Sequence, residues 1–322
     1  MEDPIRAPKE LESGTGVTAP PVESTDRASL RTWPSWLAMI IVIPGSLMVS
    51  GVVLLVAALA MGDFELSEGA QLTSWIKEIS STRLGLLILI LPGQAFFCAA
   101  AIGMAALSTA SIPSRLGLVR PRGSLKTWVL LALACPAVQL ASLLFASLFF
   151  DLDEPSEHLE MINGLLTSQS GFVGVSLVLL LAAIAPGFSE ELFFRGFVRV
   201  GLERRHGFLV AILVPALMFA AVHMDPMHAT AVFPLGLYFG CLTYWSRSTL
   251  PAIGAHVINN LFAIISALAF STEEIVSPDN ETMSSTSGME ELGAITVLGY
   301  LICILFLFAG IKSLCSDRSD RT

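Results

Sequence analysis

Long apolar segments with almost no charge constrain this chain more than any other feature of its sequence. A run of 18 or more apolar residues is long enough to cross the hydrocarbon core of a bilayer as a helix, and several such runs follow one another here. Charged residues make up only 14% of the 322 residues, whereas about 25% is typical of soluble domains. The sequence therefore predicts an all-α fold, a polytopic transmembrane helix bundle.

Charges, Pro and Gly divide these runs into about eight expected spans. Basic residues mark the cytoplasmic side of short loops; here they follow every second span, and acidic residues fill the alternate loops. This pattern predicts a multi-pass protein of the cell membrane with both termini in the cytoplasm. The expected spans are 36–62, 84–110, 125–150, 172–200, 208–224, 229–246, 250–270 and 293–313.

Composition also separates the chain into regions. Residues 1–33 are rich in Pro, Ser, Thr and Glu and hold too few large apolar side chains to form a core, so we expect a disordered cytoplasmic tail. Transmembrane spans over 34–150 should follow, then a core at 172–265 that carries the polar residues described below, and a last span at 293–313. The formal net charge of −9 comes from acidic loops, and we expect no nucleic-acid partner.

The fourth span contains charged residues that require a partner or a function. Glu190, Glu191 and Arg195 lie among phenylalanines, although a charged side chain at mid-bilayer costs about 2.5 to 3.5 kcal/mol on insertion scales. Glu191 and Arg195 are four positions apart and can pair on one helical face, whereas Glu190 points about 100° away. Glu190 is thus predicted to be the general base. Alternatively, all three residues form a buried charge cluster that only fastens helices.

Local signals suggest how this span is shaped. Pro186 and Gly187 should loosen the helix, and Ser189 should cap a restarted helix just before the two glutamates. Spans four and five should form an antiparallel hairpin that turns at 206–207, which places the end of span five level with the glutamates.

Two histidines and an asparagine occur in the following spans. His223 ends span five, and His256 and Asn260 lie four positions apart in span seven, on one helical face. A single histidine is usually a satisfied core residue. Together with the glutamates, however, these residues are nearly all the ionisable groups inside the second half of the membrane region, which favours one shared site.

Three motifs in this order resemble the type II CAAX prenyl proteases and their bacteriocin-processing relatives, the CPBP family. The resemblance covers roughly 172–265 and rests on Glu190-Glu191-x-x-x-Arg195, Phe219-x-x-x-His223 and His256-x-x-x-Asn260. It implies an intramembrane peptidase with a CAAX protease-like catalytic core and a cavity open toward the cytoplasm. In that reading Glu190 and His223 activate the attacking water, and His256 and Asn260 stabilise the oxyanion. Arg195, with Phe219 as further structural support, holds Glu191.

Metal dependence is left open by the sequence. Glu190, His223 and His256 form a set of the kind that binds catalytic zinc with an open fourth position, and Glu191 would then act as the base. The other possibility, which we prefer, is that Glu190 and His223 activate the water without a metal, because Asn260 beside His256 is better used as a hydrogen-bond donor.

The expected partners are the lipid bilayer and a peptide or membrane-anchored protein substrate. Serine and aspartyl intramembrane proteases are excluded, because the chain has neither a Gly-x-Ser-Gly loop nor an aspartate within a span. Two other functions remain: a proton-coupled membrane transporter, in which these groups relay protons, and a catalytically inactive scaffold of the same family. A transporter usually has two similar halves, whereas the polar residues here all lie in the second half.

Overall fold

The computed structural model describes residues 33–61, 69–152, 154, 156–274 and 285–319, and all of them lie in one compact unit covering 32–322. Almost all of the predicted tail, 1–32, and parts of two acidic loops, 62–68 and 275–284, lie outside the described residues. In the described part every regular element is a helix, which confirms the all-α prediction.

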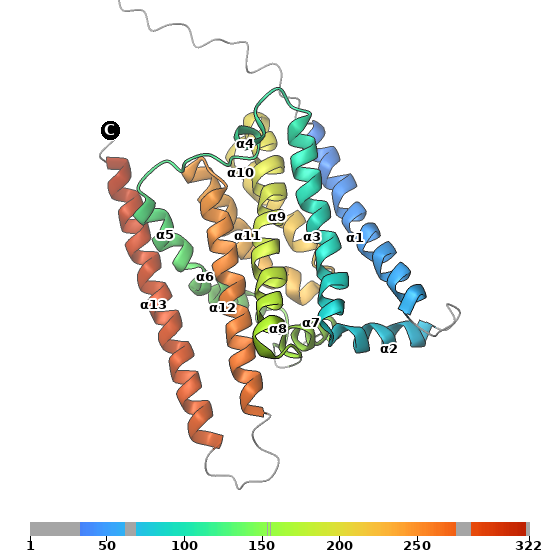
Figure 1. Cartoon of the computed structure of the whole chain (residues 1–322). Helices are drawn as coiled ribbons and strands as arrows, with labels where there is room; N and C mark the ends of the chain where they lie inside the picture. Colours follow the sequence, from blue (N-terminus) through green and yellow to red (C-terminus); the bar gives the residue numbers. More distant parts are fainter. Residues whose placement is uncertain (1–32, 62–68, 153, 155, 275–284, 320–322) are drawn as a thin grey trace, which may run out of the picture. The chain divides into compact units, whose positions relative to one another are not determined.

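The helices, in chain order and with η marking a π-helical segment, are α1 (Trp33–Met61), α2 (Gly69–Ser80), α3 (Arg83–Ala106), α4 (Ile112–Arg115), α5 (Leu125–Leu133), α6 (Cys135–Ala146), α7 (Glu157–Thr167), α8 (Gly171–Val178), η2 (Leu179–Ile184), α9 (Ala185–Glu191), η3 (Leu192–Val198), α10 (Arg199–Ala221), α11 (Pro226–Ser246), α12 (Leu250–Glu274) and α13 (Ser285–Ser319). In Figure 1, α13, α12, α9, α3 and α1 follow one another across the view, each in contact with the next. Helix α11 packs against α10, α12 and α6.

Side-chain caps fix where several of these helices begin. The Thr82 hydroxyl accepts a hydrogen bond from the Gly85 N–H at 3.0 Å and starts α3. Ser124 and Ser156 cap α5 and α7 in the same way. Asp225 precedes Pro226 at the start of α11 and accepts from a backbone N–H of its first turn. These caps satisfy donors that a helix leaves unpaired at its N-terminus.

Six helical segments are long and apolar enough to cross a membrane: Ser35–Met61, Arg83–Ala106, Leu125–Ala146, Gly171–Glu203, Leu250–Leu268 and Ile295–Asp317. The chain is therefore a multi-pass membrane protein. The fifth expected span corresponds to a shorter apolar helix, Arg205–Ala221, and the sixth to α11. The number of spans, eight, and the cytoplasmic position of both termini stay predictions.

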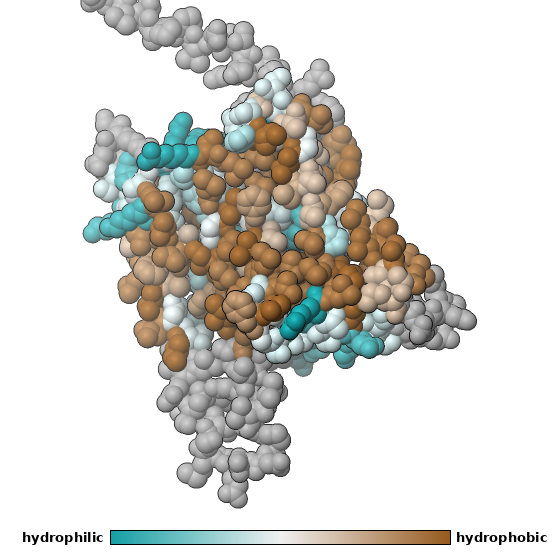
Figure 2. Space-filling model, viewed as in Figure 1, coloured by the Kyte–Doolittle hydropathy of each residue, from teal (hydrophilic) through white to brown (hydrophobic). Residues whose placement is uncertain are grey.

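The surface agrees with a lipid environment. Figure 2 shows apolar residues covering most of the visible flank of the helices, with hydrophilic residues gathered mainly toward the two ends. Large apolar side chains such as Ile40 and Met48 on α1 and Phe308 on α13 are about two-thirds exposed. Water would not favour so much exposed apolar area, whereas lipid tails do.

The hairpin between the fourth and fifth spans turns where the sequence predicts. Gly207 lies inside α10 with φ 75° and ψ −169°, so the element consists of two helical parts joined at this residue. A positive φ of this kind is easily adopted by glycine and rarely by other residues.

The predicted restart of the fourth span, capped by Ser189, is wrong, whereas the predicted loosening of the helix takes the form of π turns. The backbone stays helical through Pro186, and the Ser189 hydroxyl contacts the Ala185 carbonyl at 2.8 Å instead of capping a new helix. The helix accommodates the proline by widening into π turns on both sides of α9, over Leu179–Ile184 and Leu192–Val198. Such π segments are frequent at functional sites, and here they flank the two glutamates.

The charge pattern of the loops gives a direct test of topology. Reporter fusions at Ser156 and Ser285 should read as external, and fusions at Gly123 and at the C-terminus as cytoplasmic, because basic residues stay on the cytoplasmic side. The measurement is the paired activity of a cytoplasmic and an external reporter at each position. Inverted readings at two or more positions would contradict the predicted topology.

Candidate active site

An internal cavity of about 580 Å³ brings together residues from both halves of the chain. Its polar lining includes Glu190, His223, His256 and Asn260, with Phe219 beside them. The remaining wall is largely apolar and comes from α1, α3, α6, α7, α11 and α12. A core assigned to 172–265 alone would lack the α1, α3, α6 and α7 walls.

Glu190 faces this cavity from α9 and is 8% exposed. Its Oε1 accepts a hydrogen bond from Gln94 Nε2 on α3 at 2.9 Å. In the described part of the chain this is the one hydrogen bond to the carboxylate, and the nearest cations belong to other pairs. Glu190 is thus placed as a carboxylate in contact with the cavity contents.

Glu191 and Arg195 form the expected ion pair behind the cavity wall. Arg195 Nη1 donates to Glu191 Oε1 at 2.6 Å, and their side chains are 1% and 0% exposed. Arg195 Nη2 donates to the Gly236 carbonyl at 2.9 Å, and the guanidinium carbon lies 4.5 Å from the ring centre of Phe219 and 5.3 Å from that of Phe239. Aromatic faces stabilise a desolvated cation, which accounts for arginine in so apolar a setting.

His256 contacts Glu191, a pairing that the sequence interpretation did not include. Its Nδ1 lies 3.0 Å from Glu191 Oε1, and its ring stacks on Phe239 at 4.9 Å and meets the edge of Phe219 at 5.6 Å. A carboxylate accepts hydrogen bonds, so Nδ1 carries the proton and the ring orientation is fixed. Nε2 is then the nitrogen that can act on a molecule in the cavity.

His223 lies in the turn that follows α10. Its Nδ1 is 2.9 Å from the Phe219 carbonyl; because a carbonyl oxygen only accepts, Nδ1 donates and Nε2 carries the lone pair in the neutral ring. The next residue, Met224, has a left-handed φ of 58°. The ring centre of His228 at the start of α11 is 4.4 Å from that of His223.

Asn260 contacts the helix that carries the glutamates. Its Nδ2 donates to the Ala182 carbonyl at 3.2 Å. In an α-helix this carbonyl would accept from the N–H of residue 186, but Pro186 has no N–H. One of the two amide hydrogens of Asn260 is therefore used structurally, and the other remains for the cavity. The neighbouring Asn259 also lines the cavity and accepts from the Cys135 thiol.

Gly187 allows α9 and α12 to approach each other at the site. A Cβ on this residue would lie 2.6 Å from Val257 Cγ2 and 3.0 Å from the Val257 backbone nitrogen. Neither distance is compatible with the present packing, and His256 is the neighbour of Val257. Gly187 therefore controls the distance between the glutamates and His256.

Replacing Gly187 by Ala should separate the two helices and lower the thermal unfolding midpoint, because overpacking a filled core typically costs about 1 to 3 kcal/mol. Melting curves of purified protein in detergent would measure this. Gly103→Ala is the matched control, because a Cβ on that helical glycine meets no atom within 4 Å. A Gly187→Ala protein as stable as Gly103→Ala would contradict the close packing.

The zinc alternative receives no support from the arrangement of side chains. In the described ranges no group of three or more His, Cys, Asp or Glu side chains is placed to hold a metal ion. Glu190, His223 and His256 share the cavity without forming such a set, and Glu191 is used by Arg195 and His256.

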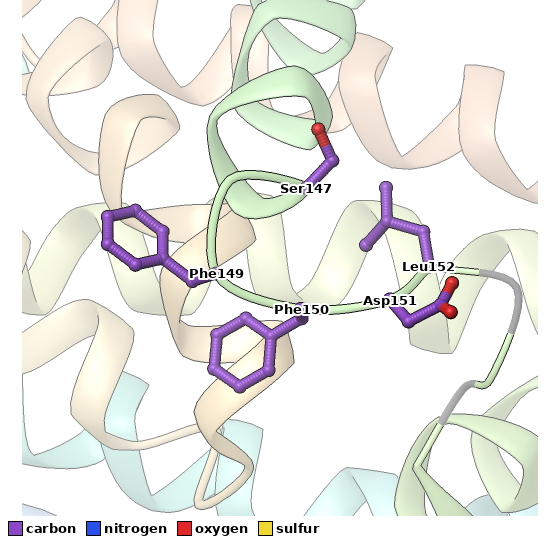
Figure 3. Close-up of a pocket in the computed structure, with 5 residues that line it drawn as sticks. All are labelled: Ser147, Phe149, Phe150, Asp151 and Leu152. Carbon is purple, nitrogen blue, oxygen red and sulfur yellow. The ribbon is translucent and has the colours of Figure 1, made fainter.

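Two other hollows do not include Glu190, His223, His256 or Asn260 in their walls. One of about 440 Å³ adjoins the cavity and shares Gln139, Leu159 and His228 with it. The other, of about 520 Å³, is an open hollow at the end of α6 (Figure 3), lined by Ser147, Phe149, Phe150, Asp151 and Leu152. With one carboxylate and a hydroxyl, the latter lacks the combination of base and donors found around Glu190.

Sequence interpretation missed Gln94, His228 and Asn259, all of which line the cavity. Gln94 had a usable signal, because a polar side chain in a long apolar run requires a partner.

The bundle defines a multi-pass helical membrane protein with a cavity among its helices. Residues 172–262 match the family described as Type II CAAX prenyl endopeptidase Rce1-like. The match agrees with the resemblance carried by the three motifs and covers the helices that hold the two glutamates, His223 and His256. Comparison with curated proteins and with solved structures found no significant match.

Proposed function

We propose that this protein is an intramembrane endopeptidase that hydrolyses peptide bonds of membrane-associated substrates. The observation that carries the proposal is the convergence of Glu190, His223, His256 and Asn260 on one cavity. Glu190 comes from α9, His223 from the turn after α10, and His256 and Asn260 from α12. A carboxylate, two imidazole rings and a side-chain amide thus line one cavity. Peptide hydrolysis needs this combination.

In the proposed mechanism a water molecule lies between Glu190 and His223. Glu190 accepts a proton from the water as the water oxygen attacks the peptide carbonyl carbon. The carbonyl π electrons move to oxygen and give a tetrahedral oxyanion. When the carbon–nitrogen bond breaks, the carbonyl re-forms and the leaving nitrogen takes the proton from Glu190, directly or through His223. The products are a carboxylic acid and an amine.

The oxyanion is stabilised by donors from α12. Glu191 accepts from His256 Nδ1 at 3.0 Å and fixes the orientation of the ring. When the ring is protonated, its Nε2–H donates to the developing charge. The remaining amide hydrogen of Asn260 is a second donor. Donors aimed at a developing oxyanion in a water-poor site typically contribute factors of about 10² to 10³ each.

The cavity wall favours a substrate with a large apolar portion. Apolar side chains from α3, α7 and α12 line the cavity together with Glu190, including Leu89, Ile90, Ile162, Leu165 and Ile264. A peptide or a membrane-anchored protein, including one with a prenyl group, fits this chemistry, and we propose that it enters from the cytoplasmic side. The lipid bilayer is the second partner.

Isotope incorporation tests the reaction class. Wild-type protein in proteoliposomes should cleave a membrane-anchored model peptide, and in ¹⁸O-enriched water the new C-terminal carboxylate should gain one labelled oxygen, measured by mass spectrometry. His256→Phe, which keeps an aromatic ring between Phe219 and Phe239, should cleave at least about 10²-fold more slowly.

The alternatives predict different results from the same proteoliposomes. A proton-coupled transporter would move protons with a solute and leave the peptide intact. An inactive scaffold would show neither activity. Either result with folded protein would overturn the proposed function.

A further inference from the structure

The carboxylate proposed as the base has a support outside the family segment. Gln94, on α3, donates from Nε2 to Glu190 Oε1 at 2.9 Å across 96 residues of sequence. Its own Oε1 accepts from the hydroxyl of Ser189, the residue just before Glu190. Both ends of the amide are therefore engaged by α9.

We propose that Gln94 and Ser189 are positioning residues that hold the Glu190 carboxylate for water activation, an inference that rests on the proposed function. A carboxylate can only accept hydrogen bonds, so the Gln94 NH₂ must face it. The Ser189 hydroxyl, by donating to Gln94 Oε1, fixes that orientation of the amide. Glu190 Oε1 is then held by α3, and Oε2 is left for the water.

The same contacts serve the protonated state of Glu190. The Ser189 hydroxyl is also 2.8 Å from the Ala185 carbonyl. After Glu190 gains a proton, the amide can turn over: Glu190 donates to Gln94 Oε1, the Gln94 NH₂ donates to the Ser189 oxygen, and the Ser189 hydrogen goes to Ala185. Each donor keeps an acceptor in both states, so proton uptake breaks no buried hydrogen bond without replacing it.

The competing interpretation is that Gln94 only fastens α3 to α9. Gln169 provides the matched control, because its Nε2 donates to the Ser81 carbonyl at 2.8 Å and thereby joins the α7–α8 connection to the α2–α3 turn, outside the cavity. Met replaces Gln at similar length without donors or acceptors. Gln94→Met and Gln169→Met therefore remove the same kind of bond, but only the first is at the base.

In a cleavage assay, Gln94→Met should lower kcat on the order of 10- to 100-fold, with KM and the melting midpoint close to those of Gln169→Met. Ser189→Ala should lower kcat less. Adding it to Gln94→Met should cause no further loss, because both act through one contact. Ser189→Thr, which keeps the hydroxyl, should retain activity.

A second readout does not depend on cleavage. Dicyclohexylcarbodiimide enters membranes and reacts with protonated carboxyl groups, and mass spectrometry can locate its adduct. Without the Gln94 donor the carboxylate is less stabilised, so Glu190 should be modified several-fold faster in Gln94→Met than in wild type or Gln169→Met.

The two readouts separate the two proposals. Faster labelling of Glu190 in Gln94→Met, with no cleavage by wild type, would support the positioning role and overturn the proposed function. Unchanged labelling, or an equal loss of kcat in Gln169→Met, would overturn the positioning role while leaving the peptidase standing.

Discussion

Replacing Glu191 by Gln should lower the free energy of unfolding by about 3 to 5 kcal/mol, because it leaves a buried cation without its carboxylate. Arg195 is 1% exposed, and its other contacts among the described residues are the neutral Gly236 carbonyl and aromatic faces. His256 loses the same carboxylate. Few single substitutions in this chain should have a larger effect on stability.

A double-mutant cycle makes this prediction specific. Glu191→Gln and Arg195→Met should each be strongly destabilising, and the double mutant should lose much less than the sum, because replacing a buried pair by neutral groups leaves no uncompensated charge. Reversible unfolding in mixed micelles would give the three values. Glu160→Gln, on the exposed surface of α7, is the control for the acid-to-amide change. Additive losses would contradict the pair.

The ion pair could be predicted from the sequence because it is local. Residues four apart on a helix are neighbours whatever the rest of the fold does. In agreement with this spacing, Arg195 Nη1 and Glu191 Oε1 lie 2.6 Å apart. The turn at 206–207 was predicted in another way, by placing Glu190 and His223 level with each other in an antiparallel hairpin, and Gly207 joins the two helical parts there. The apolar runs were enough to predict a helical membrane bundle, because length and composition decide that class.

The contacts between helices could not be predicted from residue spacing or composition. His256 meets Glu191 across 65 residues, and the approach depends on the absence of a side chain at Gly187 beside Val257. Gln94 is paired with Glu190 by the packing of α3 on α9. Spacing rules within one helix carry no information about such pairs.

The π segments mark a further limit. Pro186 predicted a loosened helix, restarted at Ser189, because a proline removes a hydrogen bond. The structure keeps the helix, widens it on both sides of α9, and has Asn260 donate to the Ala182 carbonyl. A proline signal therefore identified the right place and the wrong geometry.

Replacing Glu190 by Gln should abolish turnover while leaving the fold intact. Glu190 has no dedicated cation among the described residues, and its hydrogen bond comes from a neutral amide, so an isosteric neutral side chain leaves no buried charge unpaired. Loss of a general base typically lowers the rate by about 10² to 10⁴-fold. The two substitutions should thus have different effects: Glu191→Gln should lower mainly the stability, and Glu190→Gln should lower mainly the rate of cleavage. Stable, inactive Glu191→Gln with unstable Glu190→Gln would reverse their roles.

The central claim is that Glu190 is the base of a peptidase, and single-turnover cleavage tests it most directly. Wild type, Glu190→Gln and the control Glu160→Gln would be compared in proteoliposomes at equal amounts of folded protein, with a membrane-anchored peptide and excess enzyme. If Glu190 is the base, wild type and Glu160→Gln should cleave the peptide at similar rates. Glu190→Gln should cleave it at least about 10²-fold more slowly, at an unchanged melting midpoint. Cleavage by Glu190→Gln at the wild-type rate would contradict it.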